Sequence, residues 1–134
     1  MFPIEFTFEG PPLSLQSKNK TRKRAYKQNI ENTARQILPP GFQPSSESLQ
    51  IIITYYYEGD TPDIDNIIKP IQDALNGVVY VDDKQIEDIR SRKKDINGSY
   101  RIRNTSLCLL KAFGEGKDFI HVKIDNYSNN QLLD

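Results

Sequence analysis

The most constraining feature of the sequence is the segment Leu49–Tyr57, in which every residue except Gln50 is aliphatic, aromatic or β-branched. Residues of these types favour strands. A run of them without polar alternation is typical of a strand that has lost solvent on both sides. Polar turn residues follow it, ending at Pro62. We therefore expect a strand over 49–57 that is buried on much of both faces.

Shorter patterns indicate three further strands and three helices. Residues 4–9 alternate between apolar and polar side chains, which is the period-two pattern of a strand with one buried face. Ile30, Ala34 and Ile37 recur at helical spacing before a proline pair. Residues 14–22 show no periodicity and are expected to form a basic loop. The expected elements are strands over 4–9, 49–57, 86–94 and 119–124, and helices from about 24 to 38, from about 65 to 75, and from 104 or 105 to about 113.

These elements predict an α+β (mixed α/β) fold. The chain has 134 residues, a length that suggests one domain, so we expect a single domain over 1–134 with about four strands in a mixed sheet and about three helices. No apolar run approaches the roughly 20 residues that span a bilayer. No basic leader with an apolar run follows Met1. We therefore expect a cytoplasmic protein with no membrane partner.

The residue counts exclude several kinds of site. A single cysteine, Cys108, excludes an internal disulfide and zinc sites with two thiolates, and a single histidine, His121, excludes zinc sites with two imidazoles in one chain. Neither G-x-x-x-x-G-K-[ST] nor G-x-G-x-x-G occurs, so the common nucleotide-binding loops are absent. Any catalysis by this chain is expected to use carboxylates and lysines.

The formal net charge of zero conceals a strong segregation of charge along the chain. Residues 1–57 carry a net charge of +3, residues 58–88 carry −7, residues 89–103 carry +5, and residues 104–134 carry −1. An acidic segment therefore lies between two basic ones. Either folding mixes these charges over the surface, or the segregation reflects a charged substrate.

The acidic segment contains a candidate metal site. Asp63 and Asp65 precede a helix on which Lys69 and Asp73 would share one polar stripe with Asp65, at i, i+4 and i+8. Asp82 and Asp83 follow the next turn. Carboxylates brought close together repel one another unless a cation bridges them. Oxygen ligands without imidazole or thiolate select Mg²⁺, with Mn²⁺ as a possible substitute. Such an ion could activate water and stabilise a leaving oxygen at a phosphate.

Other interpretations of the same residues stay open at this point. Asp63 or Asp65 could cap the helix, and Asp82 could cap another. Asp65 and Lys69 could form an ordinary i, i+4 ion pair, worth about 0.3–0.5 kcal/mol. A calcium loop counted from Asp63 is not favoured, because its twelfth position is Ala74 rather than glutamate.

Two basic clusters flank this acidic segment. Short basic runs of this kind commonly contact phosphates, although a solubilising loop and an exposed sheet face are the alternative. In the second cluster, the basic residues alternate and would project from one face of a strand. The candidate DNA-binding residues are Lys18, Lys20, Arg22, Lys23, Arg24 and Lys27 in the first cluster, and Arg90, Arg92 and Lys94 in the second.

The acidic motifs resemble those of the RusA family of Holliday junction resolvases. That family shows D-x-D-N-x-x-K, then D-A-L-x-G, then D-D-x-Q-[IV]. Here the corresponding segments are Asp63–Lys69, Asp73–Gly77 and Asp82–Ile86, at nearly the same spacing. The resemblance covers about residues 3–95 well and the last third loosely. The family's arginines just before D-x-D are absent here, where Asp60–Pro62 stand in their place.

The resemblance implies a RusA-like fold and a function. Carried over position by position, the catalytic residues would be Asp63, Asp65, Lys69 and Asp83, with the three aspartates as Mg²⁺ ligands. The expected protein is a homodimeric, Mg²⁺-dependent endonuclease that resolves four-way DNA junctions by paired symmetric nicks. Two alternatives are a branched-DNA binding protein that does not cut and a metal-dependent nucleotide hydrolase.

Overall fold

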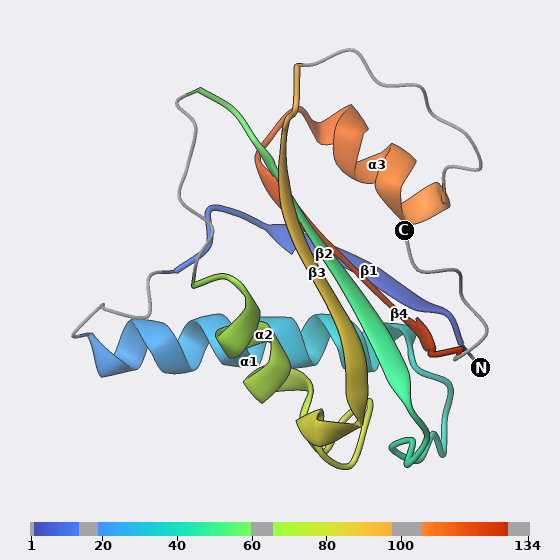
Figure 1. Ribbon diagram of the computed structural model, residues 1–134. Helices are drawn as coiled ribbons and strands as arrows, with labels where there is room; N and C mark the ends of the chain where they lie inside the picture. Colours follow the sequence, from blue (N-terminus) through green and yellow to red (C-terminus); the bar gives the residue numbers. More distant parts are fainter. Residues whose placement is uncertain (1, 14–18, 60–65, 98–105, 129–134) are drawn as a thin grey trace.

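The strands and helices build one four-stranded mixed sheet with helices on both sides (Figure 1). The computed structural model describes residues 2–13, 19–59, 66–97 and 106–128. The predicted α+β class, with four strands and three α-helices among the described residues, is confirmed. The elements are β1 (Ile4–Glu9), α1 (Lys20–Ile37), β2 (Leu49–Tyr57), α2 (Ile68–Leu75), the short 3₁₀ helix η1 (Asp83–Gln85), β3 (Ile86–Asp95), α3 (Leu107–Glu115) and β4 (Phe119–Asn126).

The strand predicted to be buried on both faces, β2, lies inside the sheet, whose order is β1-β4-β2-β3. It pairs in parallel with β3 and antiparallel with β4, and β4 in turn pairs antiparallel with β1. Six of the nine residues of β2 are buried, including the four consecutive residues from Ile53 to Tyr56. This agrees with the absence of polar alternation in its sequence.

One face of the sheet carries the main hydrophobic core. Helices α1 and α2 pack on it, with the aliphatic side chains of Ile30 and Ile71 fully buried against those of β2 and β4. The alternating apolar residues of β1 also face this core, as their period-two pattern predicts. The core on this side is therefore continuous from α1 through α2 to the sheet.

The other face carries a smaller cluster beneath α3. Tyr56 and Phe119 stack with ring centroids 4.7 Å apart, and Phe113 of α3 packs edge-on against both rings. Ala112 is the buried residue that α3 contributes. Figure 1 shows α3 (orange) on the side of the sheet away from α1 and α2.

The first helix begins earlier than its apolar pattern predicts. We expected a basic loop as far as residue 22, but α1 begins at Lys20, so this prediction is wrong for its last residues. The side chain of Asn19 accepts a hydrogen bond from the backbone N–H of Arg22 and caps the helix. Lysine and arginine favour helices, and an exposed polar turn has no apolar period to reveal it.

The starts of the other two helices also differ from the predictions. Helix α2 begins at Ile68, and Ile67 occupies its N-cap position without a capping side chain, whereas we expected a helix from near Asp65. Pro70 falls in the first turn, where its missing N–H breaks no hydrogen bond. The cap of helix α3 is Ser106, one or two residues after the start that we expected at 104 or 105, and Gly116 ends the helix in a left-handed conformation. None of the described helices is long and apolar enough to cross a membrane.

Candidate active site

The side chains of Lys69 and Asp73 meet on the exposed side of α2. The Nζ of Lys69 donates a hydrogen bond of 3.0 Å to the carboxylate of Asp73, one helical turn further on. The side chain of Lys69 is 62% exposed. The predicted polar stripe on this helix is therefore present for these two residues, while Asp63 and Asp65 lie outside the described residues.

Asp82 and Asp83 have different roles although they are neighbours in sequence. The carboxylate of Asp82 accepts from the backbone N–H of Lys84, and the Gln85 side chain accepts from the backbone N–H of Asp82, so the pair forms a capping box for η1. The hydrogen bond from the backbone of Lys84 lowers the pKa of Asp82. The alternative role for Asp82, a helix cap, is confirmed. Asp83, in the first turn of η1, has a half-buried side chain.

Electrostatics link Asp83 to the pair on α2. The hydrogen bond to Asp73 raises the pKa of Lys69, and the negative charges of Asp73 and Asp83 raise it further. Lys69 therefore remains an ammonium at neutral pH. Tyr80 is fully buried nearby and donates a hydrogen bond of 2.7 Å to the backbone carbonyl of Gln72. Burial raises the pKa of Tyr80, and the charges of Asp83 and Asp73 add to this shift.

Helix α1 reaches the same place through Lys27. Its Nζ lies 3.6 Å from the carboxylate of Asp73, which thus contacts one lysine from each helix. We call Lys27, Lys69, Asp73 and Asp83 the Lys69 cluster. Sequence reasoning placed Lys27 among the DNA-binding residues but missed its contact with Asp73, because the two residues are 46 positions apart.

The basic residues of the first cluster line the N-terminal half of α1 and lead toward the Lys69 cluster. Lys20, Arg22 and Arg24 are exposed, and Lys23 and Lys27 are half-buried. Lys18 lies outside the described residues. The helix therefore carries a row of cations that ends with Lys27 beside the carboxylate of Asp73.

The second basic cluster lies on the opposite face of the sheet. Arg92 pairs in register with Thr54, its guanidinium donates a 2.9 Å hydrogen bond to the Thr54 hydroxyl, and Thr54 in turn pairs with His121 of β4. Arg90 and Lys94 project from the same face by the alternation of β3, and Arg90 contacts the carboxylate of Asp88 at 3.4 Å. The two basic clusters are therefore separated by the sheet.

The donor groups of the Lys69 cluster suit a hard divalent cation. Asp83 offers carboxylate oxygens, and among the described members of the cluster there is no imidazole or thiolate. Magnesium prefers oxygen ligands of this kind and binds through few carboxylates together with substrate phosphate. Carboxylate oxygens such as those of Asp83 would therefore suit Mg²⁺.

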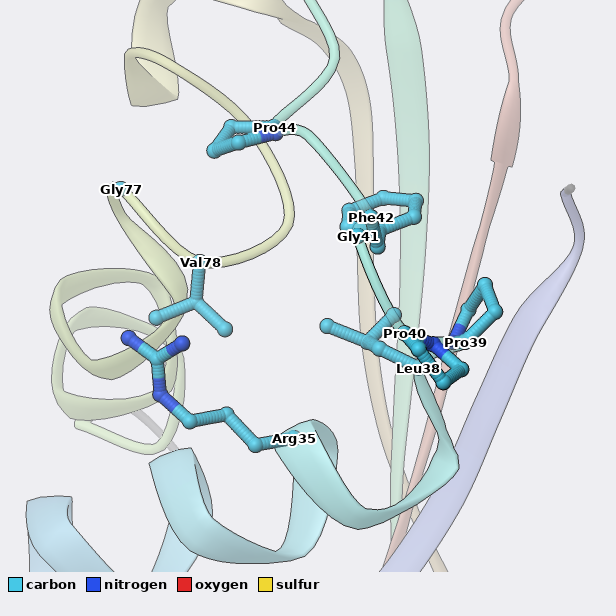
Figure 2. Close-up of a pocket in the computed structure, with 9 residues that line it drawn as sticks. All are labelled: Arg35, Leu38, Pro39, Pro40, Gly41, Phe42, Pro44, Gly77 and Val78. Carbon is cyan, nitrogen blue, oxygen red and sulfur yellow. The ribbon is translucent and has the colours of Figure 1, made fainter.

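A cavity of about 320 Å³ lies away from this cluster, at the C-terminal end of α1 (Figure 2). It lies between Arg35, the proline-rich segment from Leu38 to Pro44, and the Gly77–Val78 turn. Among the described residues that line it, Arg35 alone is charged, and it is paired with Glu31 at 2.9 Å. Neither Lys69 nor Asp83, the predicted catalytic residues that the structure describes, lines it. The candidate active site is thus an open surface of charged groups rather than this cavity.

Comparison with known proteins identifies a family of DNA-cleaving enzymes, which agrees with the charged surface described above. A family model described as "Endodeoxyribonuclease RusA" matches residues 14–103, a range that contains α1, β2, α2, η1 and β3. The chain is also 47% identical over 32 residues to the uncharacterized protein YqaN of Bacillus subtilis (strain 168). That match covers 24% of this chain and only 22% of the relative's length.

Proposed function

The chain belongs to the RusA family of endodeoxyribonucleases, and we propose that it resolves four-way (Holliday) DNA junctions by Mg²⁺-dependent hydrolysis of phosphodiester bonds. The observation that carries this proposal is the Lys69 cluster. Its two lysines and two carboxylates come together from α1, α2 and η1, and α1 carries further cations. A polyanionic substrate fits such a surface better than a small nucleotide does, because the cations extend over several turns of helix.

In this proposal Asp63, Asp65 and Asp83 hold the metal ion. When bound, Mg²⁺ would supply a nucleophile at neutral pH and stabilise charge on the leaving oxygen. Asp83 extends from the start of η1, and the Asp82 capping box fixes that turn. Asp82 is thus a positioning residue, since its carboxylate is already engaged with backbone.

Lys69 acts on the scissile phosphate as a fixed positive charge. Its raised pKa keeps it protonated, so it stabilises negative charge that develops on the phosphate oxygens rather than removing a proton. Asp73 holds the ammonium from one side at 3.0 Å, and Lys27 contacts Asp73 from α1. Asp73 therefore positions Lys69 and joins the DNA-binding helix to the catalytic lysine.

The two basic clusters would contact different parts of a branched substrate. Lys18, Lys20, Arg22, Lys23, Arg24 and Lys27 would bind the phosphates next to the cut. Arg90, Arg92 and Lys94 lie across the sheet, so they would bind a separate arm. A linear duplex has no second arm, and this arrangement therefore favours branched DNA.

Symmetric cutting of two opposed strands requires two equivalent sites, and one chain carries one set of Lys69, Asp83 and their partners. We propose a two-fold homodimer, in which the two sites match the two-fold relation between those strands. Sedimentation is expected to give about twice the chain mass of 15.4 kDa. A strict monomer, both free and on junction DNA, would contradict paired cutting.

The test of the proposed function uses a labelled four-way junction with Mg²⁺, with linear duplex and a nucleoside triphosphate as controls. We expect paired nicks in the junction and no product from either control. A gel shift of the junction without cutting would instead indicate a binding protein. Turnover of the nucleotide would indicate a nucleotide hydrolase.

A further inference from the structure

Three potential metal ligands of mixed chemistry gather on the α3 face of the sheet. They are Glu5 of β1, Cys108 of α3 and His121 of β4, and one ligand atom from each lies within 4.8 Å of the other two. We call them the Cys108 cluster. Glu5 precedes Cys108 and His121 by more than a hundred positions in the sequence. The pairing of β1 with β4 and the docking of α3 bring the three residues together.

Hydrogen bonds already orient these side chains. The carboxylate of Glu5 is contacted by His121 Nε2, and the Ser106 hydroxyl donates to the same oxygen of Glu5 at 2.8 Å. The Ser106 hydroxyl also lies 3.4 Å from the sulfur of Cys108. Ser106 caps α3, so the start of this helix fixes where the thiol stands. The side chain of His121 is 9% exposed, which leaves its ring few other orientations.

We propose that Glu5, Cys108 and His121 bind a Zn²⁺ ion, with water as the fourth ligand, and that this ion fastens α3 to the sheet. Thiolate and imidazole together select zinc over Mg²⁺, which prefers oxygen ligands alone. One thiolate and one imidazole are sufficient when a carboxylate and a water complete the tetrahedron. The counts of one cysteine and one histidine do not exclude this composition.

The geometry requires only a small rearrangement. Zinc–ligand distances of about 2.0–2.3 Å in a tetrahedron place neighbouring ligand atoms roughly 3.3–3.6 Å apart. Glu5 Oε2 and His121 Nε2 are 2.5 Å apart in the hydrogen-bonded state, so they must separate by about 1 Å. The Glu5 side chain is 21% exposed and has rotatable bonds that allow this movement. On binding, the Cys108 thiol releases its proton to solvent, and Nε2 of His121 gives up the proton that it shares with the Glu5 carboxylate, so that the neutral zinc-bound imidazole carries its proton on Nδ1.

A zinc ion at this place would strengthen the attachment of α3 to the sheet. The apolar contacts of α3 with the sheet are confined to the small cluster of Tyr56, Ala112 and Phe119 and the residues packed on it. Zinc would add bonds from two strands to the first turn of the same helix. This site does not depend on the proposed catalytic residues Lys69 and Asp83, because the sheet separates it from them.

The experiment is a titration of the full chain with Co²⁺, a spectroscopic substitute for Zn²⁺, in excess Mg²⁺. We expect one equivalent of Co²⁺ to produce a thiolate-to-cobalt charge-transfer band that Zn²⁺ abolishes. Cys108→Ser and His121→Gln should lose the band and weaken binding by at least about tenfold. Asp83→Asn is the matched control, since it alters the nuclease site and should keep the band unchanged. Zn²⁺ should also raise the Tm of the native chain but not that of Cys108→Ser.

Three results would overturn the proposal. They are a native chain without the band, Cys108→Ser that binds Co²⁺ as tightly as the native chain, and loss of binding in Asp83→Asn. A fourth measurement needs no variant: Zn²⁺ should slow alkylation of Cys108 in the native chain by about tenfold or more, because a metal-bound thiolate reacts slowly. Unchanged alkylation would equally contradict the site.

Discussion

The two faces of the sheet differ in the side chains that pack between the sheet and its helices. On the α1/α2 face, aliphatic and aromatic side chains from both helices and three strands form one continuous core, and the charged residues stand outside it. On the α3 face, a small aromatic cluster covers part of the sheet, and polar side chains occupy the rest of the interface. His121 and Thr54 are buried there, each with a polar partner.

This difference indicates which polar and charged groups can interact with a substrate without disturbing the packing of the protein. The Lys69 cluster rests on a core that does not depend on it, so its charges can be exposed and adjusted for chemistry. The polar groups of the α3 face are themselves part of the packing, and replacing one leaves its partner buried without a hydrogen bond. We therefore expect substitutions in the Lys69 cluster to reduce activity in a protein that remains folded, and substitutions of Glu5, Thr54 or His121 to reduce stability first.

The largest effect is expected from Asp83→Asn, which should abolish junction cleavage. The substitution keeps the shape of the side chain but removes the charge that a cation needs. Junction binding and Tm should be nearly unchanged, because most DNA affinity comes from cationic contacts with phosphate. Cleavage assays, gel shifts and thermal melts check these three expectations. Normal cutting by this variant would remove Asp83 from the metal site.

Lys69→Met should lower kcat by roughly 10²–10³-fold, the size seen when one group that stabilises transition-state charge is removed. Junction affinity should change little, since this effect belongs to the transition state. Lys69→Arg is the matched control and should retain more activity. Because the pKa of Lys69 is raised above its usual 10.5, its deprotonation should not reduce the rate below that pH. A variant that cuts normally at saturation but binds poorly would assign Lys69 to binding instead.

Two truncations compare the cores directly. Ile71→Ala removes a fully buried side chain from the α1/α2 face and should cost about 2–5 kcal/mol of unfolding free energy. Phe113→Ala removes a half-buried ring from the α3 face and should cost less. Denaturant unfolding measures both. A larger loss for Phe113→Ala would reverse the comparison of the two faces.

The smallest effects are expected from the basic clusters, where each cation contributes a share of binding. Replacing Lys20, Arg22 and Arg24 with alanine should lower the salt slope of binding by up to about 0.9 per lost phosphate contact, for junction and duplex alike. The same change at Arg90, Arg92 and Lys94 should weaken junction binding more than duplex binding. Salt titrations with both DNAs test this. Equal losses on both DNAs for the second variant would rule out a separate arm.

Much of the fold could be predicted from the sequence because its signals are local. Successive side chains of a strand point to opposite faces of the sheet, so burial of one face or of both leaves a pattern in the local sequence. The alternation of β1 and the unbroken run of β2 are such patterns. The start of α1 was missed because Lys20 and Arg22 are exposed, and an exposed turn leaves no hydrophobic period. Its signal was Asn19, a capping residue three positions before Arg22.

The contacts in the candidate sites are likewise of two kinds, local ones that the sequence predicts and ones between distant segments that it does not. Lys69 and Asp73 are one turn apart, so helical spacing was enough to predict their meeting. The contact of Lys27 with Asp73 depends on how α1 crosses α2, and the Cys108 cluster depends on strand register and on the docking of α3. Contacts of this kind are set by packing between distant segments, which sequence spacing does not encode.

The parallel pairing of β2 with β3 requires the chain to return along the length of the sheet between them, and α2 lies on that return. Lys69, Asp73 and Asp83 all belong to this single crossover, whose two ends are anchored in neighbouring strands. The length of this crossover therefore helps to set the distance between Lys69 and Asp83. An extra residue between α2 and η1 would displace Asp83 relative to Lys69. The connection between α1 and β2 holds the same segment from the other side, because Ser45 bridges to Tyr80 and the Gln85 side chain donates to the backbone carbonyls of Ser45 and Glu47. An insertion in either connection is therefore expected to move Asp83.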